Sequence, residues 1–382
     1  MMESLGILGG TFDPIHYGHL NIARQAIGQG LVDRVILMPA GKPPHKAAKA
    51  SREDRLAMTM LAAWGEEKID VSPIEATALT VCYTADTLER LSRMYKDARL
   101  YLILGADAAE KVPMWKDQEK LKRYCAGILT APRGEGGKKV DVPGMKVIHM
   151  EMEGTDHAAT WIREHAGEDI GSATPVEEYI RLHGLYEAGE CSMTKRLKST
   201  MPRTRYLHTL SVATTAVTLA YMHGVDPWKA HLAGMLHDCA KGLPMEEQYE
   251  WIQKGRIEAE EDELALPAIV HAPAGVAVAR EVYGVEDEEI LSAIRWHTTG
   301  KRGMSGIDKV VYLADMIEPL RRPFPGLTRI RQIAYRDLDG AVRLAARISA
   351  DHILGSGRQI LKRTLELLEE TDETTNRGGK GQ

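Results

Sequence analysis

The chain has 382 residues, with 49 lysines and arginines against 54 aspartates and glutamates and a net charge of −5. This length allows two or three domains with complete cores, and the balanced charge argues against a dedicated nucleic-acid binder. The four cysteines form no Cys-x-x-Cys pair, so neither a disulfide framework nor a zinc ribbon is indicated. The first residues enter an apolar run at once, and no run reaches membrane length, which predicts a cytoplasmic protein without a membrane partner.

Up to about residue 190, short apolar runs alternate with segments of helical spacing. Strands are expected at residues 5–8, 35–38, 100–104, 127–130 and 146–150. Ser51, with Asp54 three residues later, indicates the start of a helix, and Thr174-Pro175 indicates the start of another. Alternating strands and helices predict an α/β domain with a parallel sheet, whose ligands bind at the carboxyl ends of the strands.

The second half of the chain has a different pattern. Residues 187–192 lack periodic apolar positions and are the expected linker. From residue 206 to about residue 368, apolar residues recur at helical spacing, which predicts an all-α domain. We therefore expect domains at 1–188 and 193–370, and a disordered polar tail at 371–382.

A glycine turn and two histidines lie between the first expected strand and the first expected helix. Gly9 and Gly10 let backbone N–H groups approach a ligand closely. His16 and His19 share one side of the first helical turn, beside the positive end of the helix dipole. This arrangement suits a polyphosphate. The alternative is a glycine turn with two incidental histidines.

The segment Gly-Gly-Thr-Phe-Asp-Pro-Ile-His-Tyr-Gly-His at 9–19 resembles the signature of the nucleotidyltransferases that carry (His/Thr)-x-Gly-His. In its full form it is similar to bacterial nicotinate-nucleotide adenylyltransferases. Residues 81–88 and Gly105-Ala106-Asp107, followed by Trp115, resemble further segments of that family in the same order. The resemblance implies a Rossmann-like domain that transfers AMP from ATP to nicotinate mononucleotide with the help of Mg²⁺.

The same resemblance assigns roles to individual residues. It implies that ATP contacts Gly9, Gly10, Thr11, Phe12, His16, His19, Gly105, Asp107, Thr160 and Arg163. It implies that nicotinate mononucleotide contacts Asp13, Lys42, Thr84 and Trp115, and that His16, His19 and Lys46 assist the transfer. One departure is Ala158-Ala159, where the family usually has two serines. The alternative is another His-x-Gly-His transferase, acting on pantetheine phosphate or a cytidylyl substrate, which Trp115 and Tyr83-Thr84 argue against.

The helical half contains histidines and aspartates suited to a metal centre. Four imidazoles and two carboxylates without thiolates favour iron, manganese, cobalt, nickel or zinc over a structural zinc site. Because they are spread along several expected helices, they can meet only inside a bundle. The six residues are His208, His237, Asp238, His271, His297 and Asp315.

The order His, His-Asp, Asp along the chain resembles that of the HD phosphohydrolase superfamily. The short sequence segments around these residues resemble those of the YqeK-type HD hydrolases. That resemblance implies symmetrical cleavage of diadenosine tetraphosphate to two ADP at two divalent metals, usually iron, with manganese as a second choice. It makes His208, His237, Asp238 and Asp315 the core ligands and His271 and His297 the extra pair, with Asp238 and Lys241 in catalysis. Hydrolysis of another nucleotide, or a non-catalytic nucleotide sensor, are the alternatives. A homo-oligomer, the choice of metal and the preference for nicotinate over nicotinamide mononucleotide stay open.

Overall fold

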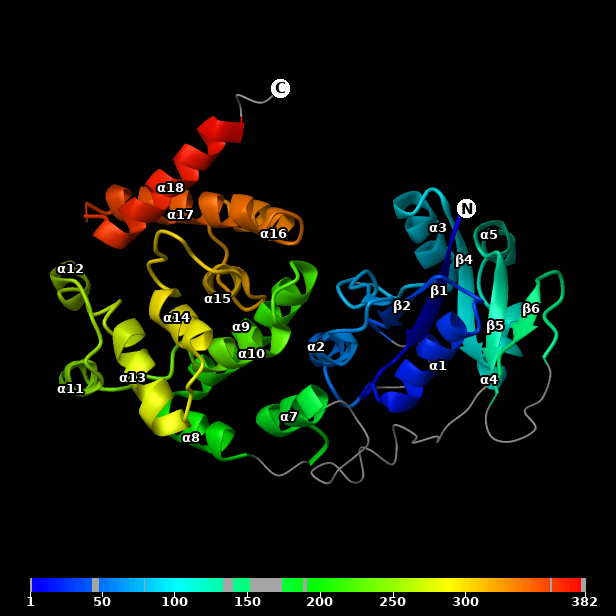
Figure 1. The fold of residues 1–382 in the computed structure, drawn as a ribbon, viewed down its shortest axis with the longest axis horizontal. Coiled ribbons are helices and arrows are strands. Elements are labelled where there is room, and N and C mark those ends of the chain that lie inside the picture. The colour runs from blue at the N-terminus through cyan, green and yellow to red at the C-terminus, as the bar shows by residue number, and fades with distance from the viewer. Residues whose placement is uncertain are drawn as a thin grey trace. The chain divides into compact units, whose positions relative to one another are not determined.

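The computed structural model describes residues 2–42, 48–78, 80–132, 140–151, 174–187, 191–357 and 359–378. The chain divides into two compact units, Met1–Gly189 and Glu190–Gln382 (Figure 1). The expected linker at 187–192 spans this division. Within the described ranges, the helices are all too short or too polar to cross a membrane.

The first unit is built on a six-stranded sheet in which every pairing is parallel, with strand order β3-β2-β1-β4-β5-β6. The strands are β1 (Glu3–Gly10), β2 (Arg34–Pro39), β3 (Ile69–Val71), β4 (Ala98–Gly105), β5 (Gly127–Ala131) and β6 (Val147–His149). The predicted α/β fold is confirmed. The sequence prediction omitted β3, because three residues are too few to give a recognisable apolar run.

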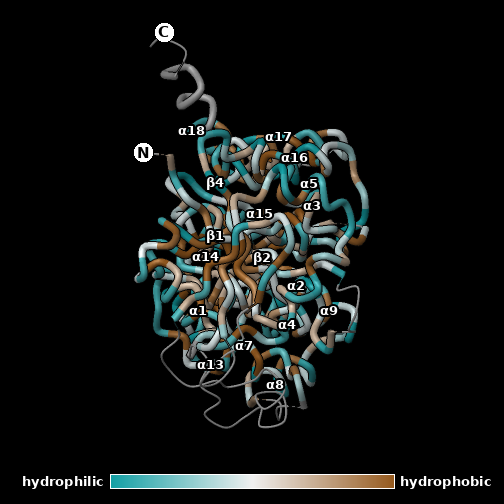
Figure 2. The backbone as a smooth tube through the Cα atoms, turned by 90° about the vertical axis from the view of Figure 1, so that its right-hand side faces the viewer, coloured by the Kyte–Doolittle hydropathy of each residue, from teal (hydrophilic) through white to brown (hydrophobic). Residues whose placement is uncertain are grey.

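Helices connect these strands and cover the sheet. They are α1 (Tyr17–Gly28), α2 (Arg52–Ala63), α3 (Thr84–Met94), α4 (Ala106–Ala109), α5 (Gln118–Tyr124) and α7 (Thr174–His183), with 3₁₀ turns η1 (Val112–Met114) and η2 (Leu185–Glu187). The Ser51 hydroxyl accepts a hydrogen bond from the Asp54 amide, which confirms the predicted helix start. Figure 2 shows the hydrophobic character of the central strands β1 and β2, and Leu5 and Ile36 are fully or almost fully buried.

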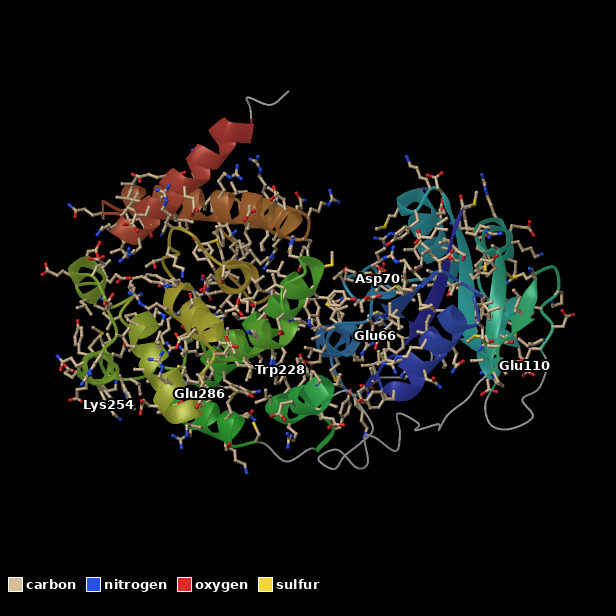
Figure 3. All side chains as sticks on the ribbon, viewed as in Figure 1. Glu66, Asp70, Glu110, Trp228, Lys254 and Glu286 are labelled. Carbon is tan, nitrogen blue, oxygen red and sulfur yellow. The ribbon has the colours of Figure 1, made fainter. Side chains whose placement is uncertain are left out.

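Ion pairs on the surface of this unit join neighbouring elements. Glu66, after α2, lies 2.5 Å from Arg24 of α1, and Asp70 of β3 pairs with Arg34 of β2. Figure 3 labels Glu66 and Asp70 among the side chains of the first unit. Because these pairs are exposed to solvent, each contributes little to the free energy of unfolding.

Among its described residues, the second unit has helices joined by turns and loops, and no strand, as predicted. The helices are α8 (Ser192–Thr200), α9 (Arg203–Met222), α10 (Pro227–Leu236), α11 (Met245–Gly255), α12 (Glu261–Leu264), α13 (His271–Tyr283), α14 (Glu288–Trp296), α15 (Gly306–Ile317), α16 (Leu327–Ala334), α17 (Leu338–Gly355) and α18 (Lys362–Gly378). Helix α9 packs against both α10 and α15, and its residues belong to both core clusters of the unit. Helix α18 continues to Gly378, so the tail predicted to start at residue 371 begins inside a helix.

Helices α9 and α10 approach each other so closely that only glycine fits at one point. A Cβ atom on Gly234 would lie 2.7 Å from the Cα atom and 3.1 Å from the backbone nitrogen of Ala213. Backbone atoms cannot move aside as a flexible side chain can. We expect Gly234→Ala to lower the free energy of unfolding by about 1–3 kcal/mol, measured by denaturant unfolding.

Gly355→Ala is the control for this change, because a Cβ atom there would meet nothing within 4 Å. An equal loss of stability in both variants would contradict the close-approach argument.

Candidate active sites

The first site lies at the carboxyl edge of the parallel sheet. Strand β1 lies between β2 and β4. From β1 the chain first adds strands on one side of the sheet and then, from β4 onward, on the other side. Parallel sheets bind ligands at the carboxyl ends of the strands at such a switch point. Gly10 ends β1 and Gly105 ends β4. Since these strands are parallel and adjacent, with Leu8 opposite Ile103, the two glycine segments lie at the same edge.

The loop after β1 brings two histidines together at the start of α1. A Cβ atom on Gly10 would lie 2.7 Å from the Phe12 ring, so glycine makes room for this buried aromatic side chain. The Phe12 ring meets His19 edge-on at 4.9 Å between centroids, and the His16 and His19 rings lie 3.8 Å apart. The His16 amide donates to His19 Nδ1 at 3.3 Å, which orients that ring. Both imidazoles therefore lie at the positive end of the α1 dipole.

The Asp13 side chain holds this loop in place through hydrogen bonds. It is 7% exposed. The carboxylate accepts hydrogen bonds from the Lys49 amide at 2.8 Å, the Ala50 amide at 3.1 Å and the Tyr186 hydroxyl at 2.7 Å. The carboxylate thus joins the loop to the entry of α2 and to η2. Its predicted contact with nicotinate mononucleotide stays a prediction, and the structure gives Asp13 a clear architectural role.

Arg55 of α2 fixes the same loop from another side, and sequence reasoning missed it. Its side chain is 1% exposed. It donates to the carbonyl of Thr11 at 2.6 Å and to the carbonyl of Gly41 at 3.0 Å. Burial lowers its pKa. The available signal was an arginine directly before the nearly all-apolar run 56–63, because a charge that is buried with such a run needs specific partners.

The hydroxyl of Tyr186 is expected to contribute to the stability of the first unit, because it donates a hydrogen bond to the Asp13 carboxylate. Tyr186→Phe leaves the buried Asp13 carboxylate without one of its donors. We expect the free energy of unfolding of the first unit to fall by about 1–3 kcal/mol, measured by chemical denaturation. Tyr124→Phe, on α5 of the same unit, is the control. A Tyr186→Phe variant as stable as the Tyr124→Phe variant would show that the hydrogen bond contributes nothing.

The segments of Thr84 and Trp115, the predicted nicotinate contacts, are held beside each other. Thr84 is the first residue of α3, and Trp115 follows η1. Their chain neighbours meet, because the Lys116 ammonium lies 4.1 Å from the centroid of the Tyr83 ring. Lys120 of α5 pairs with two carboxylates of α3 at 2.8 and 3.1 Å. The roles of Thr84 and Trp115 toward a ligand stay predictions.

Of the remaining polar residues predicted for this site, some are exposed and others lie outside the described residues. Asp107 and Lys42 are exposed, Asp107 in α4 just after β4 and Lys42 in the loop after β2. Lys46, Thr160 and Arg163 lie outside the described residues, as do Ala158 and Ala159. Their assignments stay as the resemblance gives them.

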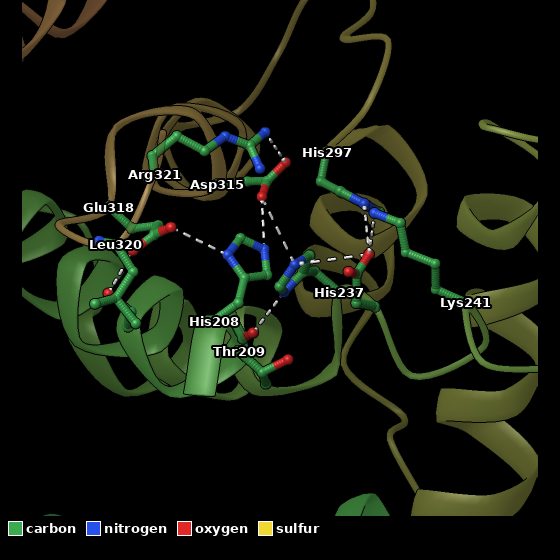
Figure 4. A network of polar contacts seen from close by, with 12 residues as sticks. His208, Thr209, His237, Lys241, His297, Asp315, Glu318, Leu320 and Arg321 are labelled. Atoms are coloured by element: carbon green, nitrogen blue, oxygen red, sulfur yellow. Dashed lines mark hydrogen bonds and ion pairs between the residues drawn. The ribbon is translucent and has the colours of Figure 1, made fainter. Parts of the chain in front are cut away.

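In the second unit, six side chains from five helical segments meet in the bundle. Figure 4 labels four of them, His208, His237, His297 and Asp315. The six side chains come from α9, the end of α10, the start of α13, the end of α14 and α15. Two overlapping groups each have all ligand atoms within 4.8 Å of one another: His208, His237 and Asp315, and His237, Asp238 and His297. His271 Nε2 joins the second group, 3.2 Å from Asp238 Oδ1. We call these six residues the histidine–aspartate cluster: His208, His237, Asp238, His271, His297 and Asp315.

The centre of the cluster contains a buried nitrogen suited to a cation. His237 Nε2 has no hydrogen-bond partner among the described residues. It lies 3.7 Å from Asp238 Oδ1 and 3.9 Å from Asp315 Oδ1. A buried polar atom without a partner is costly, and a metal ion bound by all three groups would remove that cost. The residues present therefore fit divalent metal ions.

Contacts behind the imidazoles orient them toward the centre. His237 Nδ1 lies 2.7 Å, and His297 Nδ1 2.8 Å, from the carbonyl oxygen of the residue three positions earlier. A carbonyl can only accept, so Nδ1 carries the proton and Nε2 presents its lone pair to the cluster. His208 Nδ1 lies 3.2 Å from Glu318 Oε1. Sequence reasoning missed Glu318, which directly follows the helix that carries Asp315.

The electrostatics of the cluster also favour metal ligation. Burial lowers the pKa of His237 and of His271 to about 4, so both are neutral ligands at pH 7. Burial opposes ionisation of Asp238, but neighbouring histidines hold its pKa well below the usual range. Burial lowers the pKa of His208, yet hydrogen bonds to Asp315 and Glu318 outweigh it and raise the pKa to about 9. A metal ion at Asp315 would compete with the His208 proton.

The neighbouring cysteine is not part of this donor set. Cys239 is buried, and its thiol donates to the carbonyl of Gly275 at 3.5 Å. Burial raises the pKa of this thiol, which opposes formation of the thiolate that binds metals. The cluster therefore offers nitrogen and oxygen ligands only, as the sequence predicted.

Comparison with known proteins assigns both halves. The cytidylyltransferase-like family matches residues 7–156, and the HD domain matches residues 205–320. A probable nicotinate-nucleotide adenylyltransferase of Synechococcus is 39% identical over 195 residues, which is 48% of this chain and 94% of the relative. A symmetrical bis(5′-nucleosyl)-tetraphosphatase of Bacillus subtilis is 41% identical over 146 residues, which is 38% of this chain and 77% of the relative. The chain belongs to both enzyme families.

The same two families occur in one chain elsewhere. A probable nicotinate-nucleotide adenylyltransferase/Ap4A hydrolase of Mycoplasma pneumoniae is 28% identical over 318 residues, which is 82% of this chain and 88% of the relative. The resemblance of each half, read from its motifs, is thus confirmed. Divalent metal binding follows from the HD domain and from the histidine–aspartate cluster.

Proposed function

We propose that the first unit transfers an adenylyl group from ATP to nicotinate mononucleotide, giving deamido-NAD and pyrophosphate. The observation that carries this proposal is the pair His16 and His19 at the start of α1, at the switch point of a parallel sheet. A phosphate oxygen of the mononucleotide attacks the α-phosphorus of ATP. The bond from that phosphorus to the oxygen that bridges it to the β-phosphorus breaks, and pyrophosphate leaves with this oxygen.

The protein contributes position and charge to this reaction. His16 and His19 bind the phosphates of ATP and stabilise the charge that develops as pyrophosphate leaves. The amides at the α1 N-terminus add positive potential. Thr84 and Trp115 bind the pyridine ring, since a tryptophan face suits a flat aromatic ligand. Mg²⁺ bound with ATP neutralises part of the phosphate charge.

The second unit hydrolyses diadenosine tetraphosphate to two ADP. The observation that carries this proposal is the histidine–aspartate cluster with its buried, unpartnered His237 Nε2. The cluster would hold two divalent ions, iron or manganese, which would supply an activated water and neutralise charge on the reacting phosphate. Lys241, whose ammonium lies 3.1 Å from Asp238 Oδ1, binds a phosphate oxygen of the substrate.

One experiment tests both activities on the full chain. The protein is incubated with ATP, Mg²⁺ and either nicotinate or nicotinamide mononucleotide, and separately with diadenosine tetraphosphate and Fe²⁺ or Mn²⁺. Chromatography is expected to show deamido-NAD in the first reaction and ADP in the second. If neither mononucleotide yields a dinucleotide, the first assignment fails. If the tetraphosphate stays intact with both metals, the second assignment fails.

A further inference from the structure

Two cations lie at opposite ends of the histidine–aspartate cluster. Lys241 Nζ lies 3.1 Å from Asp238 Oδ1, and a guanidinium nitrogen of Arg321 lies 3.6 Å from Asp315 Oδ2. The two aspartates in turn flank His237 Nε2. Figure 4 shows Arg321 and Lys241 on opposite sides of His237. The cluster therefore has one positive charge at each end.

The turn that carries Arg321 is fixed by contacts of its own. The Arg321 amide donates to the carbonyl of Glu318 at 3.1 Å. Arg331 of α16 donates to the carbonyls of Ile317 and Glu318 at 2.8 and 2.6 Å. The Glu318 carboxylate accepts from the Ser211 hydroxyl at 2.7 Å. The backbone, rather than the contact with Asp315, sets the position of Arg321.

Both cations keep donors for a ligand. The Arg321 side chain is 40% exposed, and its 3.6 Å contact with Asp315 is too long for a hydrogen bond. A guanidinium has five N–H donors in a fork that matches phosphate oxygens. The Lys241 side chain is 37% exposed and has three donors, one of which serves Asp238. Each end of the cluster can therefore bind phosphate.

We propose that Lys241 and Arg321 bind the two halves of one polyphosphate chain, one at each end of the cluster, and thereby place hydrolysis at its middle. The inference rests on the proposed hydrolase function and adds what sets the position of cleavage. Water supplies the oxygen of the new bond to one central phosphorus. The bridging oxygen leaves with the other central phosphorus, two ADP form, and protons pass to solvent. A chain bound at one end only slides by one phosphate and gives ATP and AMP.

The test compares Arg321→Gln with Arg322→Gln in the full chain. Arg322 is the next residue and is also exposed, so the control removes the same charge beside the site. With diadenosine tetraphosphate, we expect Arg321→Gln to raise KM about 10- to 100-fold and to divert part of the product to ATP plus AMP. Arg321→Lys, which keeps the charge without the fork, is expected to recover part of the KM. Thermal unfolding checks that all variants fold.

Binding of ADP, measured by calorimetry, gives a readout without turnover. We expect Arg321→Gln to weaken ADP binding and Arg322→Gln to leave it unchanged. Equal effects of both substitutions would overturn the inference. If the Arg321→Gln variant is slower but still gives ADP as its sole product, the claim that binding at both ends sets the position of cleavage is overturned. If the wild-type chain cleaves no tetraphosphate, the hydrolase proposal fails, whereas the ADP comparison still decides whether Arg321 binds phosphate.

Discussion

Replacing His237 by alanine is expected to abolish hydrolysis of diadenosine tetraphosphate while adenylyl transfer continues at the wild-type rate. His237 Nε2 is common to both groups of ligand atoms in the cluster, so this one change removes a ligand from each. We expect a loss of more than about a hundredfold in hydrolysis, since even residues that only support ligands cost 10- to 100-fold. Metal content per chain, measured after purification, is expected to fall with the rate.

A matched control for this prediction is His223→Gln. His223 follows α9 in the same unit and contacts the carbonyl of Ala334 at 2.6 Å, away from the cluster. It is expected to keep both metal and activity. Asp238→Ala distinguishes an enzyme from a nucleotide sensor. In an enzyme, the substitution removes metal-dependent turnover that the wild-type protein has, whereas a sensor has no such turnover to lose. A wild-type protein that binds nucleotide without turnover would therefore contradict the hydrolase assignment.

Replacing His19 by alanine is expected to lower kcat for adenylyl transfer by about 100- to 1,000-fold, the usual cost of losing one group that stabilises developing charge. The ring is oriented by the His16 amide and by the edge of Phe12, so its loss removes a positioned group and not a mobile one. Rates of deamido-NAD formation under saturating ATP measure the effect.

His149→Ala is the control within the same unit, because His149 lies on β6 and contacts Thr130. Hydrolysis of diadenosine tetraphosphate by the His19→Ala protein provides a second control, since that reaction uses the other unit. A His19→Ala variant that transfers AMP at the wild-type rate would contradict the phosphate-binding role of the α1 N-terminus.

The sequence was most informative where chemistry and local geometry coincide. His16 and His19 are three residues apart, so a helix must bring them together. Apart from the adjacent His237 and Asp238, the members of the cluster are far apart in sequence. The prediction that they meet came from the order of residue types that the HD family shares. Spacing alone would not have chosen them from the other histidines of the chain.

What the sequence could not show are the long-range contacts that hold these groups in place. Arg55 reaches the carbonyls of Thr11 and Gly41, and backbone carbonyls leave no mark in a sequence. The contact between Tyr186 and Asp13 joins residues 173 positions apart. The strand β3 is too short to give a pattern. Such features depend on tertiary packing, which local sequence propensity does not predict.

The hydrogen bond between Tyr186 and Asp13 has a consequence for the order in which the protein is made. Asp13 leaves the ribosome early, and its partner is among the last residues of the first unit. The adenylyl-transfer loop therefore gains its full set of anchors only after nearly the whole first unit has been synthesised. A fragment cut before residue 186 would contain the glycine turn and both histidines and still lack this anchor. Any excised version of the first unit should therefore extend past η2.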